Sequence, residues 1–388
     1  MRIEDRITRR RRRGRARRVV RDLSALDPTA HPDEPTGRGP TLERILDVLD
    51  PVFDGTLPPH VHVYGPKGVG KSAVVTSLFE HLARAIPSEQ SVIYTTTRTA
   101  GTPTTSFAYV DARTAPTEFA LLHATLDALS EESVPSQGVG IEAVRSRLAA
   151  SVSHDERAVV AIDHVGEPET YPARTAIELL DDVSPHVSVL TVGRTPADGL
   201  DNRFESVEVE RYQRHNLVDI LVERASNGIA RNALTHEATS EVAEWADGDA
   251  HDALSALYGA AQLAASDGTE TLDTDLVEKA IDAVPDDGCS LGRVFALPES
   301  RRQVLRAFVS VDDEDRFSVT AATEAIADTP PVSLSATTIR RVLYELSDLG
   351  LVRRVPVNGS TDGPGRPATR PIPNFSTLAF RGLDDVDR

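Results

Sequence analysis

A glycine-rich run holds the residues of this sequence that are best suited to chemistry. The run is Gly65-Pro66-Lys67-Gly68-Val69-Gly70-Lys71-Ser72, and it fits the phosphate-binding loop pattern G-x-x-x-x-G-K-[ST] at every fixed position. In that pattern backbone N–H groups surround a phosphate, the lysine reaches the β- and γ-phosphates, and the serine hydroxyl holds Mg²⁺. The sequence therefore predicts a site for a nucleoside triphosphate, taken to be ATP, together with Mg²⁺.

The segments on either side of this loop have the patterns that the loop requires. Residues 60–64 are rich in β-branched residues, as in a strand, and residues 73–85 read as a helix. A turn between a strand and a helix places the helix N-terminus, with its partial positive charge, at the phosphate. A chance glycine turn before a helix is the alternative, and the strand, loop and helix in register argue against it.

A second candidate for chemistry is Asp163, which follows the apolar run 158–162. The run has the composition of a buried parallel strand. In a phosphate-loop fold, an acid at the carboxyl end of such a strand orders Mg²⁺ through its waters. The alternative is a carboxylate that only caps the next helix.

Further strands and helices alternate around these two sites. Strands are predicted at 91–96, 107–111 and 186–192, and helices at 41–53, 117–130 and 141–152. This alternation predicts an α/β fold with a doubly wound parallel sheet and a ligand at the carboxyl ends of its strands. Beyond residue 204 only helices are predicted, at 216–226, 233–245, 251–266 and 274–283.

Residues 298–380 have the pattern of a winged helix-turn-helix. Helices are predicted at 299–309, 318–327 and 335–349, and strands at 351–357 and 371–375 on either side of a Gly/Pro-rich loop. Polar and basic residues gather where such a domain meets DNA, near the start of its last helix and on its wing. These candidates are Thr337, Thr338, Arg340, Arg341, Arg353, Arg354, Arg366 and Arg370. The alternative is a winged helix that docks a protein, with its arginines solvated.

Composition limits the class of protein. The formal net charge is −18, lysine occurs only at Lys67, Lys71 and Lys279, and this acidic, lysine-poor composition is similar to that of proteins from salt-accumulating halophiles. Local basic clusters then say more about partners than the net charge does. The single cysteine, Cys289, excludes an internal disulfide, and no apolar run is long enough to span a bilayer. We expect a cytoplasmic, nucleoid-associated protein.

The N-terminus is the basic exception in this acidic chain. Residues 1–22 include an unbroken arginine run from Arg9 to Arg13. Such an arm is expected to be disordered and to contact DNA phosphates. A solubilising tail, or a start codon placed too early, is the alternative.

The order of these segments resembles the archaeal origin-recognition (Orc/Cdc-type) replication initiators, a clade of AAA+ ATPases, over about residues 22–380. The segments that carry the resemblance, beside the phosphate loop and the run ending in Asp163, are 62–65, 109–111, 210–212, 217–225, 248–254 and 297–299. The resemblance implies that an AAA+ nucleotide-binding domain (23–204), a helical lid (205–288) and a winged-helix DNA-binding domain (298–380) follow the basic arm (1–22).

The departures from the family pattern fall on residues of hydrolysis. His164 stands where the family has the glutamate that polarises the attacking water, Arg194 where the first sensor has asparagine, and His251 where the second sensor has arginine. Arg203 lies where the family carries an arginine after the first sensor. These substitutions imply ATP binding with weak or absent hydrolysis. Two alternatives stay open: His164 acts as a base, or Glu167 substitutes for the glutamate, although a helix-start carboxylate also explains Glu167.

The sequence as a whole predicts an ATP-dependent protein that binds double-stranded DNA, resembling a replication initiator. Its expected partners are DNA and, beyond it, sister initiator proteins or a second copy of the chain, and no membrane. The alternatives are a nucleotide-switched transcriptional regulator, and an AAA+ module whose winged helix docks a protein.

Overall fold

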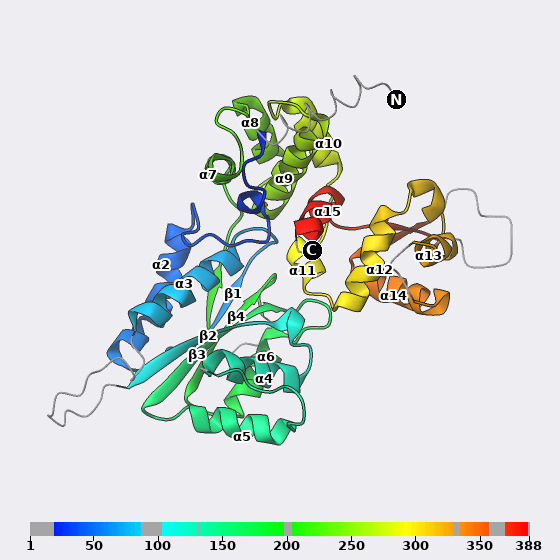
Figure 1. Cartoon of the computed structure of the whole chain (residues 1–388). Coiled ribbons are helices and arrows are strands. Elements are labelled where there is room, and N and C mark those ends of the chain that lie inside the picture. Colours follow the sequence, from blue (N-terminus) through cyan, green and yellow to red (C-terminus); the bar gives the residue numbers. More distant parts are fainter. Residues whose placement is uncertain are drawn as a thin grey trace, which may run out of the picture. The chain divides into compact units, whose positions relative to one another are not determined.

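The computed structural model describes residues 19–86, 103–130, 132–197, 204–329, 334–356 and 369–386 (Figure 1). The chain forms two compact units. One unit runs from His31 to Tyr212, and the other joins the N-terminal residues up to Ala30 with the chain from Gln213 onward.

A five-stranded parallel sheet forms the centre of the unit 31–212. Its strands lie in the order β2-β3-β4-β1-β5, and every neighbouring pair is parallel. They are β1 (His60–Tyr64), β2 (Thr104–Asp111), β3 (Glu156–Val165), β4 (Val187–Gly193) and β5 (Phe204–Glu208). The predicted α/β parallel sheet is confirmed. The sequence analysis missed β5, an edge strand with one buried residue, because it has no apolar run. The strand predicted at 91–96 lies outside the described residues.

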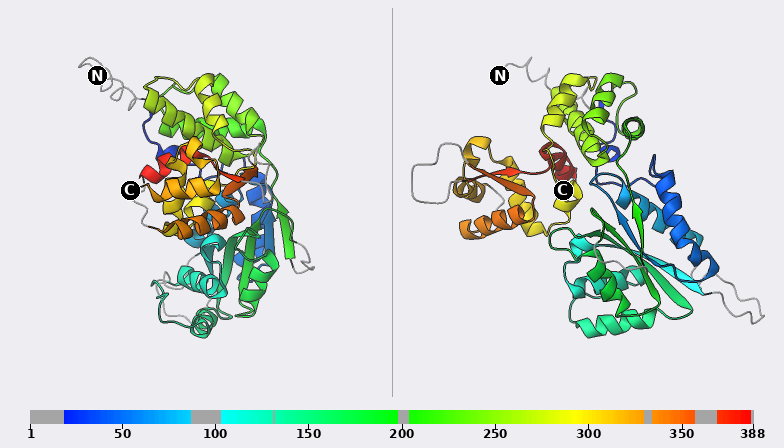
Figure 2. Two further views of the ribbon diagram at one scale, coloured as in Figure 1. Left: turned by 90° about the vertical axis from the view of Figure 1, so that its right-hand side faces the viewer. Right: turned by 180° about the vertical axis from the view of Figure 1, so that it is seen from behind.

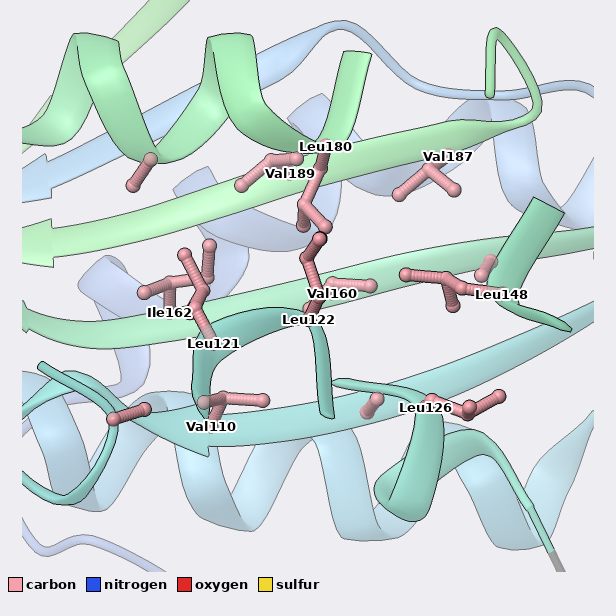
Figure 3. Packing of buried hydrophobic residues seen from close by; sticks show 14 of the residues in the cluster. Val110, Leu121, Leu122, Leu126, Leu148, Val160, Ile162, Leu180, Val187 and Val189 are labelled. Carbon is pink, nitrogen blue, oxygen red and sulfur yellow. The ribbon is translucent and has the colours of Figure 1, made fainter. Parts of the chain in front are cut away.

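Helices cover both faces of this sheet (Figure 2). They are α2 (Gly39–Leu49), followed by the 3-10 turn η2 (Asp50–Asp54), α3 (Lys71–Ala85), α4 (Glu118–Leu129), α5 (Ile141–Ser151) and α6 (Ala173–Asp181). Residues of β3 alternate between two apolar clusters. Val160 and Ile162 pack under α4, α5 and α6 (Figure 3), whereas Val159 and Ala161 pack under α2 and α3. Because every strand residue of this run is buried, the strand reads as a continuous apolar segment.

The other unit contains a bundle of four helices. These are α7 (Arg214–Gly228), α8 (His236–Trp245), α9 (Ala250–Asp267) and α10 (Thr274–Asp282), and the short α11 (Leu291–Phe295) follows them. Thr235, Asp249 and Asp273 cap the N-termini of α8, α9 and α10 with their side-chain oxygens. The predicted helix positions agree with these within a few residues.

The N-terminal segment packs on this bundle. Val19 is buried, Val20 forms an antiparallel bridge with Ile229, and Arg21 donates its N–H to the Gly228 carbonyl. The Arg224 guanidinium donates to three backbone carbonyls of residues 25–30. The expected arm of 1–22 therefore ends earlier, since 19–22 are folded, and residues 23–30 belong with the helical bundle rather than with the nucleotide-binding domain. Residues 1–18 lie outside the described residues.

The winged-helix region has the predicted elements and two more, a 3-10 turn and a C-terminal helix. They are α12 (Glu299–Ser310), the 3-10 turn η5 (Asp313–Arg316), α13 (Val319–Ala327), α14 (Ala336–Asp348), the antiparallel pair β6 (Val352–Pro356) and β7 (Thr369–Pro373), and α15 (Thr377–Val386). The sequence analysis ended this region at residue 380 and missed α15. That helix packs on α9, where a Cβ on Gly259 would meet Leu378 at 3.4 Å. No helix among the described residues is long and apolar enough to cross a membrane.

Candidate nucleotide site and nucleic-acid interface

The phosphate loop connects β1 to α3, as the pattern predicts. Gly70 has a φ of 75°, and a Cβ there would overlap with the hydroxyl of Tyr212. A Cβ on Gly65 would overlap with the Val209 carbonyl. Only glycine fits at these two positions, because one needs left-handed backbone and both lie against another segment. The glycines of the pattern are thus required by packing as well as by any ligand.

Lys71 begins α3, and its side chain turns back over the loop. Its Nζ donates to the backbone carbonyls of Gly65 (2.7 Å) and Pro66 (2.6 Å). An ammonium held over a glycine-rich turn by two carbonyls is a compact positive charge at the place where phosphates would lie. The loop therefore has the charge and the backbone geometry for a polyphosphate.

Arg38 and Tyr212 support the loop from outside it. The Arg38 guanidinium lies 3.6 Å from the centroid of the Tyr212 ring, and its Nη2 donates to the Glu210 carbonyl (2.8 Å). Burial raises the pKa of Tyr212, and the charge of Arg38 opposes that rise. This cation–π contact fixes the ring whose hydroxyl abuts Gly70. Sequence reasoning missed Arg38, because nothing in its local sequence shows the distant ring.

Asp163 is buried at the carboxyl end of β3, with 1% of its surface exposed. The Tyr109 hydroxyl donates to its Oδ2 (2.7 Å), and the His164 backbone N–H donates to its Oδ1 (2.6 Å). Burial acts to raise the pKa of Asp163, but the nearby His164 and hydrogen bonds from Ser72 and Tyr109 lower it below its usual range. The structure thus brings the predicted metal residues Ser72 and Asp163 into contact. A hydroxyl beside an ionised carboxylate suits Mg²⁺, which prefers oxygen ligands and keeps several waters.

His164 follows Asp163 in a left-handed conformation, with a φ of 64°. The pairing of β3 with β4 shifts register between Ile162 and Val165, so His164 sits in a bulge. Such a backbone is strained for a residue with a Cβ. The imidazole lies between two carboxylates: Nε2 is 3.6 Å from the Asp163 Oδ2, and Nδ1 is 3.7 Å from the Glu167 Oε1.

Glu167 meets Arg194 in the same cluster. Both the Nη2 (3.1 Å) and the Nε (3.2 Å) of Arg194 contact the Glu167 Oε1. Burial acts to raise the pKa of Glu167, but His164, Arg194 and Arg113 together lower it to about 2. The interpretation of Glu167 as a helix-start carboxylate is wrong, because α6 begins at Ala173 and Glu167 lies in the loop before it. Glu167 therefore links His164 and Arg194, two residues that the sequence analysis treated separately.

A second arginine, Arg113, approaches the cluster from the end of β2. It forms a two-pronged ion pair with Asp111, with Nη2 at 2.6 Å from Oδ2 and Nε at 3.0 Å from Oδ1. Burial acts to lower the pKa of Arg113, but Asp111, Glu167 and Asp163 raise it. Sequence reasoning missed Arg113. The parallel pairing of β2 with β3 sets Asp111, the partner of Arg113, beside Asp163 at the ends of the two strands.

His251 has structural contacts in the other unit. Its Nε2 accepts a hydrogen bond from the Leu291 N–H (2.9 Å) at the start of α11, and its Nδ1 lies 3.2 Å from the Asp252 Oδ1. The imidazole therefore caps the helix that leads from the bundle to the winged helix. A role for His251 toward a nucleotide stays a prediction, as does that of Arg203, which lies outside the described residues.

The start of α14 exposes part of the predicted DNA-binding set. Thr337 and Arg340 are exposed. Thr338 donates its N–H to the Ser335 hydroxyl (3.2 Å), so its backbone serves the helix cap. Arg341 is also exposed and pairs with Glu345 one turn along the helix.

The arginines of the wing likewise include both exposed and paired side chains. Arg353 is exposed, whereas Arg354 stacks on the Tyr344 ring with its guanidinium carbon 5.0 Å from the centroid. Arg370 forms an ion pair with Asp313 (2.7 Å). Arg366 lies outside the described residues. Tyr344, an aromatic ring 41% exposed beside these arginines, is a residue that the sequence analysis did not select.

Two family profiles match the chain. Residues 34–192 match the AAA ATPase domain, and residues 218–282 match the Cdc6 AAA+ ATPase-type lid domain. The chain is similar to the ORC1-type DNA replication protein 1 of Sulfurisphaera tokodaii, at 25% identity over 88% of this chain and 87% of the relative. It is also similar to the ORC1-type DNA replication protein 1 of Halobacterium salinarum, at 23% identity over 67% of this chain and 81% of the relative.

The fold is similar to that of a solved structure, the Aeropyrum pernix ORC1 protein in complex with DNA. The TM-score is 0.61 at 22% identity, and the match covers 95% of this chain and 97% of the other. This likeness shows the fold. The resemblance found in the sequence, an AAA+ domain followed by a lid of the Cdc6 type and a winged helix, is confirmed.

Proposed function

We propose that this chain, which belongs to the AAA ATPases with a Cdc6-type lid, binds ATP with Mg²⁺ and binds double-stranded DNA as a replication initiator. The relatives named above are replication proteins, and one protein of the same fold was solved with DNA. The observation that carries the proposal is the contact between Ser72 and the buried, ionised Asp163 beside a complete phosphate loop.

The residues of the loop fit the cofactor that they imply. Backbone N–H groups from Gly65 to Gly70 and the Lys71 ammonium would hold the phosphates. Ser72 would ligate Mg²⁺ directly, and Asp163 would hold it through water. When bound, Mg²⁺ neutralises charge on the β- and γ-phosphates. Tyr109 keeps Asp163 in place through its hydroxyl, so the metal carboxylate is oriented before any ligand arrives.

DNA binding is supported by the exposed cations of the winged helix. Arg340 and Arg353 are exposed in a chain whose net charge is −18. These exposed arginines lie on α14 and on the wing, the parts of this fold that meet DNA. Their presence favours phosphate contacts over a solvated protein-docking face. The arginine run of residues 9–13 precedes the anchored residue Val19 and would add a sequence-independent contribution.

Hydrolysis is proposed to be weak. The position that resembles the water-polarising glutamate holds His164, and the ring of His251 is used by α11. The residues expected to bind the nucleotide fit the family pattern, whereas those at the hydrolytic positions differ from it. This combination is typical of a slow nucleotide switch. The same feature favours a second candidate, a nucleotide-switched transcriptional regulator. A sister protein, or a second copy of this chain, is the proposed protein partner.

A DNA-binding measurement with defined nucleotides tests the proposal. Fluorescence anisotropy with genomic fragments, in ATP, ADP or no nucleotide, should show DNA binding whose affinity depends on the nucleotide. A variant that begins at residue 18 should bind all sequences more weakly by the same factor and with a shallower salt dependence. Absence of DNA binding in every nucleotide state would reject the proposal. Mapping of bound genomic sites then separates the two candidates, since initiators occupy origins and regulators occupy promoters.

A further inference from the structure

We propose that Glu167 is the carboxylate that orients the attacking water in this chain, and that Arg194 withholds it by ion pairing. This inference rests on the proposed function, because it assigns the hydrolytic residues of the same nucleotide site. It gives the slow turnover a structural cause in a contact that can open.

The position of Glu167 supports its role in orienting the attacking water. A chain of contacts leads from the phosphate loop to its carboxylate: Ser72 meets Asp163, His164 lies 3.6 Å from Asp163, and Glu167 lies 3.7 Å from the other nitrogen of His164. Only one imidazole ring therefore separates Glu167 from the metal carboxylate. The left-handed bulge at His164 brings this loop residue back toward the strand end.

The ion pair of Glu167 supports the proposal that Arg194 withholds it. Two nitrogens of Arg194 contact the same oxygen of Glu167, so this oxygen is occupied. A carboxylate held in this way is a poor proton acceptor, because the pair stabilises its charged form. Hydrolysis through Glu167 is therefore slow while the pair is closed, although Arg194 contacts only Oε1.

The two side chains differ in how easily they could leave the pair. The Arg194 side chain is 41% exposed, whereas that of Glu167 is 6% exposed. The guanidinium regains its hydration when it turns into water, whereas the carboxylate stays buried without this partner, so the open state is costly and only sparsely populated. The arginine is thus the moving partner, and Glu167 is the residue that becomes available.

The chemical step is ordinary hydrolysis. The water oxygen bonds to the γ-phosphorus, and the bond from that phosphorus to the β,γ-bridging oxygen breaks, with its electron pair leaving on ADP. Glu167 takes the proton of the water and passes it to the inorganic phosphate. The opposite hypothesis is that Arg194 stabilises charge on the γ-phosphate, and it predicts the opposite effect of removing the arginine.

Single-turnover hydrolysis of ATP by the full chain separates these hypotheses. The variants are Arg194→Asn, Glu167→Gln and the double variant. The matched control is Arg174→Asn, which breaks a surface ion pair with Glu178 whose side chains are both 57% exposed. Arg194→Asn should raise the rate by about tenfold, less than the roughly 100-fold or more that a positioned base usually contributes. Glu167→Gln should remove that gain in the double variant, and the control should match the wild type.

A binding and a stability measurement complete the test. ATP affinity, measured with a fluorescent analogue, should stay within about twofold in all variants, because the phosphate loop is unchanged. The fall in melting temperature caused by Arg194→Asn should be partly restored in the double variant, since Glu167→Gln removes the buried charge that has lost its Arg194 partner. Arg194→Lys is the substitute if Arg194→Asn does not fold. Because lysine keeps the positive charge, we expect a gain in rate over the wild type of less than about tenfold.

The outcomes distinguish failure of this inference from failure of the proposed function. If the wild type binds no ATP, the proposed function is wrong. If it binds ATP but Arg194→Asn is slower than or equal to the wild type, Arg194 does not withhold the base. A gain that survives in the double variant would assign the base to another residue, and Glu167 would then be structural.

Discussion

The phosphate loop and the charged cluster at the ends of β3 and β4 lie in one unit but are built differently. The loop is one continuous stretch from Gly65 to Ser72, fixed by glycines that no other residue could replace. The cluster joins Asp163 and His164 of β3, Glu167 of the loop after it, and Arg194, which directly follows β4. The residues proposed to bind the nucleotide are therefore local in sequence, whereas those proposed for hydrolysis come together through contacts that only the fold creates.

This difference explains what the sequence could predict. The loop, the apolar run before Asp163 and the helices of the bundle were predictable because their signals are periodic or contiguous. Glu167 was misinterpreted, since its partner Arg194 lies 27 positions away. Arg38 was missed for the same reason, because Tyr212 is distant in the chain. The edge strand β5 was missed because only one of its residues is buried, so it shows no apolar run. The helix α15 was missed because the predicted winged-helix domain ended at residue 380, inside that helix.

The largest expected effect comes from the loop. Lys71→Ala should weaken ATP binding by about 100-fold or more, because the positive charge that is expected to meet the phosphates is lost. Titration with a fluorescent ATP analogue measures this, with circular dichroism to check folding. Lys67→Ala is the matched control, since Lys67 occupies a variable position of the pattern. Equal losses in the two variants would show that net charge, not the pattern, determines affinity.

The cluster should appear in the pH dependence of stability. The folded pKa of Glu167, about 2, is below its ordinary value of 4.5. Its contribution to the free energy of unfolding is therefore present above pH 4.5 and lost as the pH falls toward 2; the shift corresponds to about 3 kcal/mol. Urea unfolding should show Glu167→Gln less stable than the wild type at pH 6, with the difference shrinking toward pH 2.

The surface pair again supplies the control. Glu178→Gln removes an exposed partner of Arg174 and should change stability little at any pH. If Glu167→Gln behaves in the same way as Glu178→Gln, the cluster is a surface feature. The contrast with the phosphate loop would then lose its energetic basis.

The winged helix allows the same kind of contrast between exposed and paired cations. Arg340→Ala with Arg353→Ala should weaken DNA binding by about tenfold and reduce the slope of its salt dependence by about one per arginine. Arg370→Ala should have a smaller effect, because that side chain already pairs with Asp313. Anisotropy titrations at several salt concentrations measure both quantities. A larger effect of Arg370→Ala would mean that its pair opens on DNA.

The smallest expected effect concerns His251, a residue predicted to act on the nucleotide whose ring also accepts a hydrogen bond from the Leu291 N–H. His251→Arg removes the acceptor of the Leu291 N–H and should lower the free energy of unfolding by about 1 kcal/mol. His251→Gln offers a carbonyl oxygen that can accept the same hydrogen bond, so it should retain more of the stability. Thermal unfolding of the two variants measures the difference, and ATP turnover should be equal in both. If His251→Arg instead raises turnover, above all together with His164→Glu, then this position also faces the nucleotide, and hydrolysis would depend on residues of both units.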